Sequence, residues 1–182
     1  MNSWSKNNYE SCKKEERYED YKKEEKNCST IIKCGYPSSV SLPVVAIGLA
    51  TQELPLTSLT LDTSCICNPR VKIDFTTNLV IPIAALLLGP INIQIFKQCR
   101  NQLNRVPVGP AFTVGPLVVV GSQTVSFFVC DSDSCENECC TYTAVASIPA
   151  LAVALVGGSL NNSTLAATVA CGDNGCKKPC NY

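Results

Sequence analysis

Residues 123–146 read Q-T-V-S-F-F-V-C-D-S-D-S-C-E-N-E-C-C-T-Y-T-A-V-A, with a strand-like run on each side of an acidic, Cys-rich link. Residues 124–129 and 141–144 alternate with a period of two and are rich in β-branched and aromatic side chains, which is typical of β-strands. A short acidic link joins the two runs, so the pattern predicts a β-hairpin. Four cysteines crowd its turn, namely Cys130, Cys135, Cys139 and Cys140.

The chain after residue 34 repeats this theme of short strand-like runs. Gly, Pro and Asn turns separate the runs, and helical periodicity is almost absent. The clearest strand covers residues 70–76, in which Val71, Ile73 and Phe75 are expected to face the core. Residues 100–110 are expected to form a loop. The other expected strands cover residues 40–48, 57–62, 79–88, 91–99, 112–120, 150–156 and 164–171.

Regularly spaced short strands predict an all-β fold for a body that extends over residues 34–170. We expect a two-sheet β-sandwich with jelly-roll topology, or a related Greek-key arrangement. Residues 171–182 form a Cys-rich C-terminal tail, and residues 1–33 form a charged N-terminal arm or connector. The arm holds 8 of the 15 Lys and Arg residues and 7 of the 15 Asp and Glu residues. It has too little apolar surface to fold alone, so both a solvated helix and disorder are compatible with its sequence.

Charge and composition argue against several classes of function. A net charge of zero offers no basic field for nucleic acid or anionic lipid. The absence of histidine removes the usual general base and every Ser-His or Cys-His pair. Polar residues, Gly and Pro interrupt the apolar runs, so no membrane span is predicted, and the first residues lack the apolar segment of a secretory signal. We therefore expect a protein that is not an enzyme and has no cofactor, nucleic-acid partner or membrane partner.

The 13 cysteines are far more than a cytosolic chain of this length usually contains. Zinc sites built from cysteine commonly show two C-x2-C knuckles, and the sequence contains none. The acidic side chains of residues 131–138, Asp131 among them, lack the frame of an EF-hand and are expected at a solvated hairpin tip. No metal ligand is therefore assigned, and thiols at strand ends and in both tails favour disulfides. The within-chain candidates are Cys65, Cys67, Cys135, Cys171 and Cys176, of which the last two flank a tight turn.

An odd number of cysteines leaves one for a free thiol or for a bond to another chain. Cys12 and Cys28 lie on the charged arm, and Cys180 lies almost at the C-terminus. These three are the thiols best placed to reach a neighbouring chain, although all of them could also close local loops.

Several motifs of the body resemble a family of uncharacterised Cys-rich proteins from spore-forming clostridia. The resemblance extends over residues 34–142. The motifs are C-G-Y-P at 34–37, L-T-L-D-T-S-C at 59–65, V-K-I-D-F-T-T at 71–77, I-N-I-Q-I-F-K-Q-C at 91–99 and F-F-V-C-D-S-D-S-C-x-x-E-C-C-T-Y at 127–142.

The overall plan is also similar to that of the endospore appendage (Ena) pilus subunits of spore-forming bacilli. Those subunits are jelly rolls with a flexible N-terminal connector, and they stack through sheet-edge pairing and connector disulfides. The resemblance implies that Cys12, Cys28 and Cys34 serve as connector thiols. It also implies that their acceptors on other chains lie among Cys99, Cys130, Cys139 and Cys140. Together with Cys180, these connector thiols and acceptors are the inter-chain candidates.

The sequence therefore predicts a structural subunit of an extracellular filament or spore-surface layer. Its expected partners are copies of itself and other spore-surface proteins, and inter-chain disulfides are expected to lock the assembly. A spore protein is made in the mother cell without a signal peptide and meets oxygen when that cell lyses. Two alternatives remain open, namely a cytoplasmic thiolate metal-binding protein and a monomeric adhesin or ligand-binding sandwich.

Overall fold

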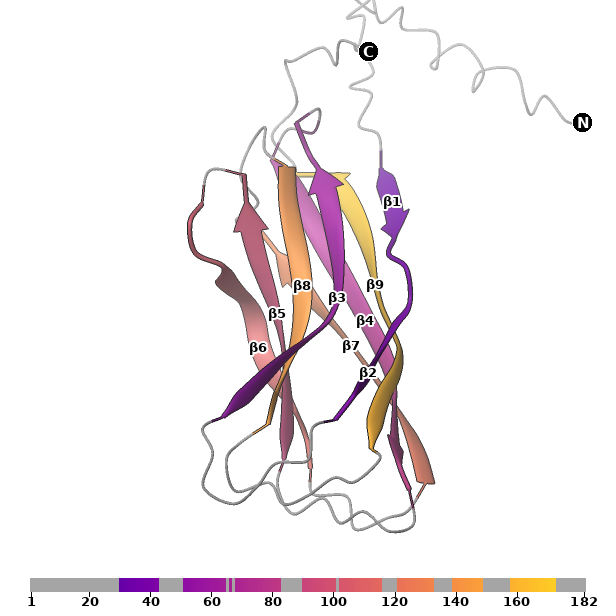
Figure 1. The fold of residues 1–182 in the computed structure, drawn as a ribbon. Helices are drawn as coiled ribbons and strands as arrows, with labels where there is room; N and C mark the ends of the chain where they lie inside the picture. Colours follow the sequence, from indigo (N-terminus) through magenta and orange to yellow (C-terminus); the bar gives the residue numbers. More distant parts are fainter. Residues whose placement is uncertain are drawn as a thin grey trace, which may run out of the picture.

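The computed structural model describes residues 30–42, 51–64, 66, 68–82, 90–100, 102–115, 121–132, 139–148 and 158–172. These residues form nine β-strands in two facing sheets (Figure 1). The strands are β1 (Ile31–Cys34), β2 (Ser38–Ser41), β3 (Gln52–Asp62), β4 (Pro69–Ile81), β5 (Ile91–Cys99), β6 (Val106–Val114), β7 (Gly121–Asp131), β8 (Cys139–Ile148) and β9 (Ser159–Cys171). The all-β prediction is confirmed.

The strand order is that of a jelly roll. Sheet A has the order β1-β9-β4-β7, with β2 also paired to β9, and sheet B has the order β3-β8-β5-β6. All of these pairs are antiparallel. From β2 onward only β5 and β6 are neighbours both in sequence and in one sheet, and the other links cross from one sheet to the other. Two Greek keys of this kind make up the predicted jelly-roll sandwich.

The predicted hairpin between residues 124–129 and 141–144 is wrong, although both strands exist. β7 pairs with β4 in sheet A, whereas β8 lies between β3 and β5 in sheet B. Facing sheets lie about 10 Å apart, and a link of a few residues spans that gap as easily as it turns a hairpin. Alternation therefore predicted each strand but not its partner.

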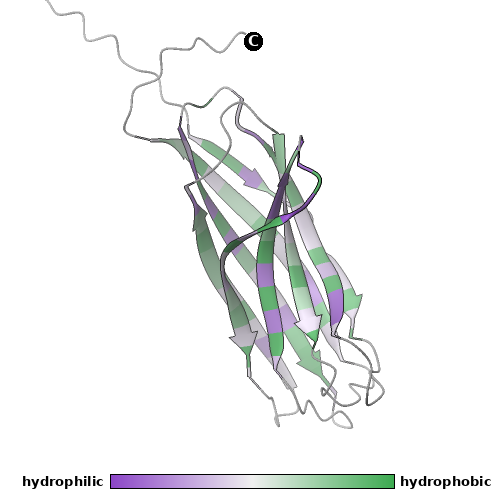
Figure 2. Cartoon of the chain, turned by 90° about the vertical axis from the view of Figure 1, so that its left-hand side faces the viewer, coloured by the Kyte–Doolittle hydropathy of each residue, from purple (hydrophilic) through white to green (hydrophobic). Residues whose placement is uncertain are grey.

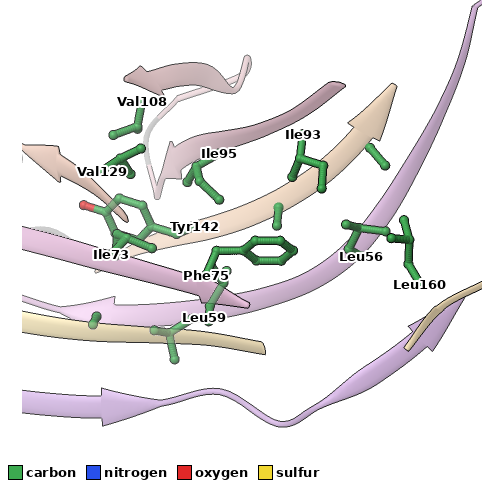
Figure 3. Packing of buried hydrophobic residues seen from close by; sticks show 14 of the residues in the cluster. Leu56, Leu59, Ile73, Phe75, Ile93, Ile95, Val108, Val129, Tyr142 and Leu160 are labelled. Carbon is green, nitrogen blue, oxygen red and sulfur yellow. The ribbon is translucent and has the colours of Figure 1, made fainter. Parts of the chain in front are cut away.

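The core forms because inward side chains on both sheets are apolar. On β4, Val71, Ile73, Phe75, Leu79 and Ile81 are all buried, as alternation predicts. Figure 3 shows such residues from both sheets filling the space between them. Figure 2 shows hydrophobic and hydrophilic residues interspersed along the strands, as expected where one face of each strand lies in the core.

The runs 70–76 and 79–88 were expected as two strands, but β4 continues without a break through Ile81. Thr77 is responsible, because its hydroxyl is buried within 2.8 Å of the Ser163 hydroxyl and donates to the Asn161 carbonyl at 3.2 Å. Because its hydroxyl has these partners, Thr77 can occupy an inward position between Phe75 and Leu79, and the strand continues. Residues 83–89 lie outside the described part.

The predicted loop at residues 100–110 is partly wrong, because β6 already begins at Val106. Pro107 and Pro110 lie within β6, and prolines are tolerated on a strand at the edge of a sheet. Gly109 has a φ of 67°, and a Cβ there would lie 2.9 Å from Val129 Cγ1. Only glycine fits this close approach of β6 to β7.

Four further predictions fall partly or wholly outside the described residues. Of the expected strand 40–48, the described part is in β2, which ends at Ser41. The expected strand 150–156 and most of the charged arm lie outside it. Of the expected tail, only Cys171, at the end of β9, and Gly172 are described.

Candidate functional site

The sheets end in edge strands, and most of these edges are short or interrupted. β1 and β2 have four residues each. On β3, Pro55 coincides with a register shift, and β6 carries Pro107 and Pro110. Short length, bulges and proline are the usual means by which proteins prevent an edge from pairing with another chain.

β7 lacks these protections. It is eleven residues long, pairs with β4 on one side, and has no described strand on its other side. Residues 121–130 contain neither proline nor a charged side chain. An open edge of this length presents a row of backbone donors and acceptors to any strand that can pair with it.

The outward face of β7 is polar along most of its length and apolar near its end. Ser122, Thr124 and Ser126 are exposed, and the Phe128 side chain is 58% exposed. Lys72 on β4 lies 5.0 Å from the centre of the Phe128 ring and forms an ion pair of 2.6 Å with Asp74. The free thiol of Cys130 follows two residues later on the same exposed face.

The inward face of β7 holds the edge strand in place. Phe127 stacks on Phe112 of β6 with ring centroids 3.8 Å apart, and it contacts Phe75 at 5.2 Å. These rings join the two sheets beneath the open edge and hold β7 against the sandwich.

Three cysteines are free among the residues that the structure describes. Cys34 is exposed on β1, Cys130 is exposed on β7, and Cys139 is half-buried at the start of β8. Cys139 lines a shallow depression on the outside of sheet B together with Gln98 and Arg100. The resemblance implied that Cys34 is a thiol of the flexible connector. Cys34 instead lies in sheet A, where β1 pairs with β9.

Cys99 and Cys140 form a disulfide within the chain, so their assignment as inter-chain candidates is wrong. They occupy facing positions on β5 and β8, and both are buried. The resemblance could not reveal this, because facing positions depend on strand register. A loop of 41 residues closed in this way stabilises a fold by about 4 kcal/mol in the chain-entropy account.

One of the remaining cysteine candidates is disulfide-bonded, and the others lie outside the described residues. Cys171, at the end of β9, is also in a disulfide. The other candidates lie outside the described residues, namely Cys12, Cys28, Cys65, Cys67, Cys135, Cys176 and Cys180.

A buried ion pair joins the two sheets close to the Cys99–Cys140 disulfide. Lys97 Nζ on β5 lies 2.8 Å from Asp131 Oδ2 on β7, and the Tyr142 hydroxyl donates to the same oxygen at 2.7 Å. The expected position of Asp131 at a solvated tip is therefore wrong. Residues 91, 93, 95, 97 and 99 all face inward, so the alternation of β5 could have identified Lys97 as a buried cation that needs a partner.

The described part of the chain contains neither a cluster of metal ligands nor a helix that could span a membrane. No group of three or more Cys, Asp or Glu side chains is placed to hold a metal ion there. No helix of that part is long and apolar enough to cross a bilayer.

This geometry defines the class of the protein as a disulfide-bonded jelly-roll β-sandwich. More particularly, the chain belongs to the family described as "Domain of unknown function (DUF4489)", whose model matches residues 28–171. A comparison with curated proteins found no match.

Solved structures give likenesses of fold. A structure of infectious bursal disease virus, Gx strain, matches with a TM-score of 0.51 and 9% identity over 81% of this chain. The match covers 35% of the viral chain, so this chain spans about a third of that protein's length. A carbohydrate-binding module specific for non-crystalline cellulose, CBM28, matches with a TM-score of 0.35 and 15% identity, over 62% of this chain and 72% of that chain.

Proposed function

We propose that this protein is a non-enzymatic structural subunit that assembles with copies of itself into an extracellular filament or layer on the spore surface. Pairing along sheet edges joins the subunits, and disulfides between chains then lock the contact. The observation that carries the proposal is the open edge of β7, which ends beside the exposed thiol of Cys130.

The edge supports assembly because an uncapped strand adds another strand at low cost. Its backbone groups can exchange hydrogen bonds with water for hydrogen bonds with a neighbour, and the exposed Phe128 side chain then loses contact with water. The support from Phe112 and Phe127 means that little conformational entropy is lost on pairing.

The thiols support a covalent lock. Cys99 and Cys140 form their bond inside the sandwich, whereas Cys34 and Cys130 remain free on its outer surface. Exposed thiols of two adjacent copies can meet only after the copies have docked. Oxidation on lysis of the mother cell then forms these bonds after the copies have docked.

The test combines electrophoresis and electron microscopy on air-oxidised, full-length protein. We expect a ladder on a non-reducing gel that collapses to a single 19.5 kDa species on reduction, and filaments in negative stain. The variant S122K/S126K places two charges on the open edge and should prevent filaments. A111K places a charge on the proline-protected edge strand β6 and should leave them intact.

Far-UV circular dichroism should show the same strand content in both variants, because all three substituted side chains are exposed. A single band in both lanes and an absence of filaments in the unmodified protein would overturn the proposed function.

A further inference from the structure

The two edge strands of sheet A, β1 and β7, run in directions that would let them pair between two copies. β1 is antiparallel to β9, β9 to β4 and β4 to β7, so β1 is antiparallel to β7. A second copy placed beside the first in the same orientation therefore brings its β1 antiparallel against the open side of β7. The outer face of the sheet continues on the same side across such a junction.

The free thiols of Cys34 and Cys130 lie on that same outer face. Cys34 pairs in register with Ala166, Ala166 with Asp74, and Asp74 with Phe128. Cys130 is two residues beyond Phe128 and points to the same side. A stagger of two residues, or about 7 Å, therefore brings Cys34 of one copy opposite Cys130 of the other.

We propose that Cys34 at the end of β1 of one copy lies opposite Cys130 near the end of β7 of the next, that the chain beyond Cys34 continues along β7, and that the two thiols form a disulfide between the copies. The inference rests on the proposed function and specifies its contact. Each thiol gives up a proton and an electron as the S–S bond forms, and dioxygen accepts both electrons and both protons to give hydrogen peroxide.

The same register accounts for two exposed aromatic side chains. Tyr36 is 91% exposed and Phe128 is 58% exposed in the single chain. With Cys34 opposite Cys130, the chain beyond Cys34 runs back along β7 and carries Tyr36 toward Phe128. An aromatic pair across two strands adds to the stability of such a contact.

The contact joins two different edges, so it does not close on itself. Each copy adds four strand positions to sheet A, because β1 and β2 share one edge, and this advances the assembly by about 19 Å. The stagger displaces each copy along the strand direction. A repeated heterologous contact of this kind generates an open fibre rather than a dimer.

The decisive experiment mixes equal amounts of isotope-labelled and unlabelled full-length chains under reducing conditions, followed by oxidation in air. Digestion with pepsin at low pH, which suppresses thiol exchange, then releases linked peptides for mass spectrometry. We expect a Cys34–Cys130 linked pair, with about half of the pairs containing one labelled and one unlabelled peptide, because a heterologous contact joins two chains.

Single-thiol variants provide the matched control. C34S and C130S should each reduce the mixed-isotope pair to background, whereas C139S, which removes the third free thiol of the described residues, should leave it unchanged. All three side chains lie at least partly at the surface, so the fold should survive each change.

The outcomes separate this inference from the proposed function. Fibres that contain Cys130–Cys130 pairs, or pairs joining either thiol to another cysteine, would overturn the proposed register and leave assembly standing. A Cys34–Cys130 pair without mixed isotopes would do the same, because it would lie within one chain. The absence of both fibres and inter-chain pairs would overturn the two together.

Discussion

Replacement of Asp131 by asparagine tests how much of the fold depends on its buried ion pair. The substitution removes the carboxylate charge that lies 2.8 Å from Lys97 Nζ while it keeps the shape of the side chain and an acceptor for the Tyr142 hydroxyl. Loss of one member of a buried pair typically costs 3–5 kcal/mol, because the other charge stays away from water. We expect D131N to lower the free energy of unfolding by about 3 kcal/mol or more.

The Lys72–Asp74 pair is a matched control within the same chain. Its separation of 2.6 Å is close to that of the buried pair, but its side chains are 47% and 44% exposed, against 6% and 5% for Lys97 and Asp131. Exposed pairs contribute about 0–1 kcal/mol, so D74N should change stability by no more than that. The comparison isolates burial, since distance and residue types are nearly the same.

The measurement is urea unfolding in the S122K/S126K background, which is expected not to form filaments, followed by far-UV circular dichroism at neutral pH. The double variant K97M/D131N should recover at least half of the loss, because an apolar side chain at residue 97 suits its buried position. Equal destabilisation by D131N and D74N would refute the reasoning, and so would a double variant that is less stable than D131N alone.

Four further changes have defined expectations. G109A should destabilise the fold by about 1–3 kcal/mol in urea unfolding, because residue 109 has a φ of 67° and a new Cβ would press against Val129. C99A/C140A should cost about 2–4 kcal/mol in the same assay and should lower the melting temperature without preventing filament formation. Hydrogen bonds from the Ser64 side chain and then its backbone hold the pKa of Asp62 below its usual value. A stabilising contribution is therefore present above the unfolded pKa and is lost as the pH falls through the folded one, so D62N should reduce the acid sensitivity of the melting temperature below about pH 4. T77V should destabilise the fold by about 1–3 kcal/mol in urea unfolding, since the buried Ser163 hydroxyl loses its 2.8 Å partner.

Local alternation was sufficient to predict most strands and the class of the fold. Residues 70–76 and 91–99 alternate so regularly that their inward side chains follow from sequence alone, and the structure places them as expected. The reason is that a strand with one face in the core must repeat its apolar residues with a period of two. The same rule, applied two residues beyond Ile95, would have identified Lys97 as buried.

The tertiary structure alone decided which strands pair, and with that the candidate site. Alternation is a property of one strand, whereas pairing is a contact between strands that lie far apart in sequence, so β7 and β8 looked like a hairpin until each was placed in its own sheet. Once the register was known, Cys99 faced Cys140, Asp131 entered the core beside Lys97, and β7 became an open edge with a free thiol on its outer face. The number and positions of the cysteines follow from the sequence, but the partner of each cysteine depends on distances that only the folded chain establishes.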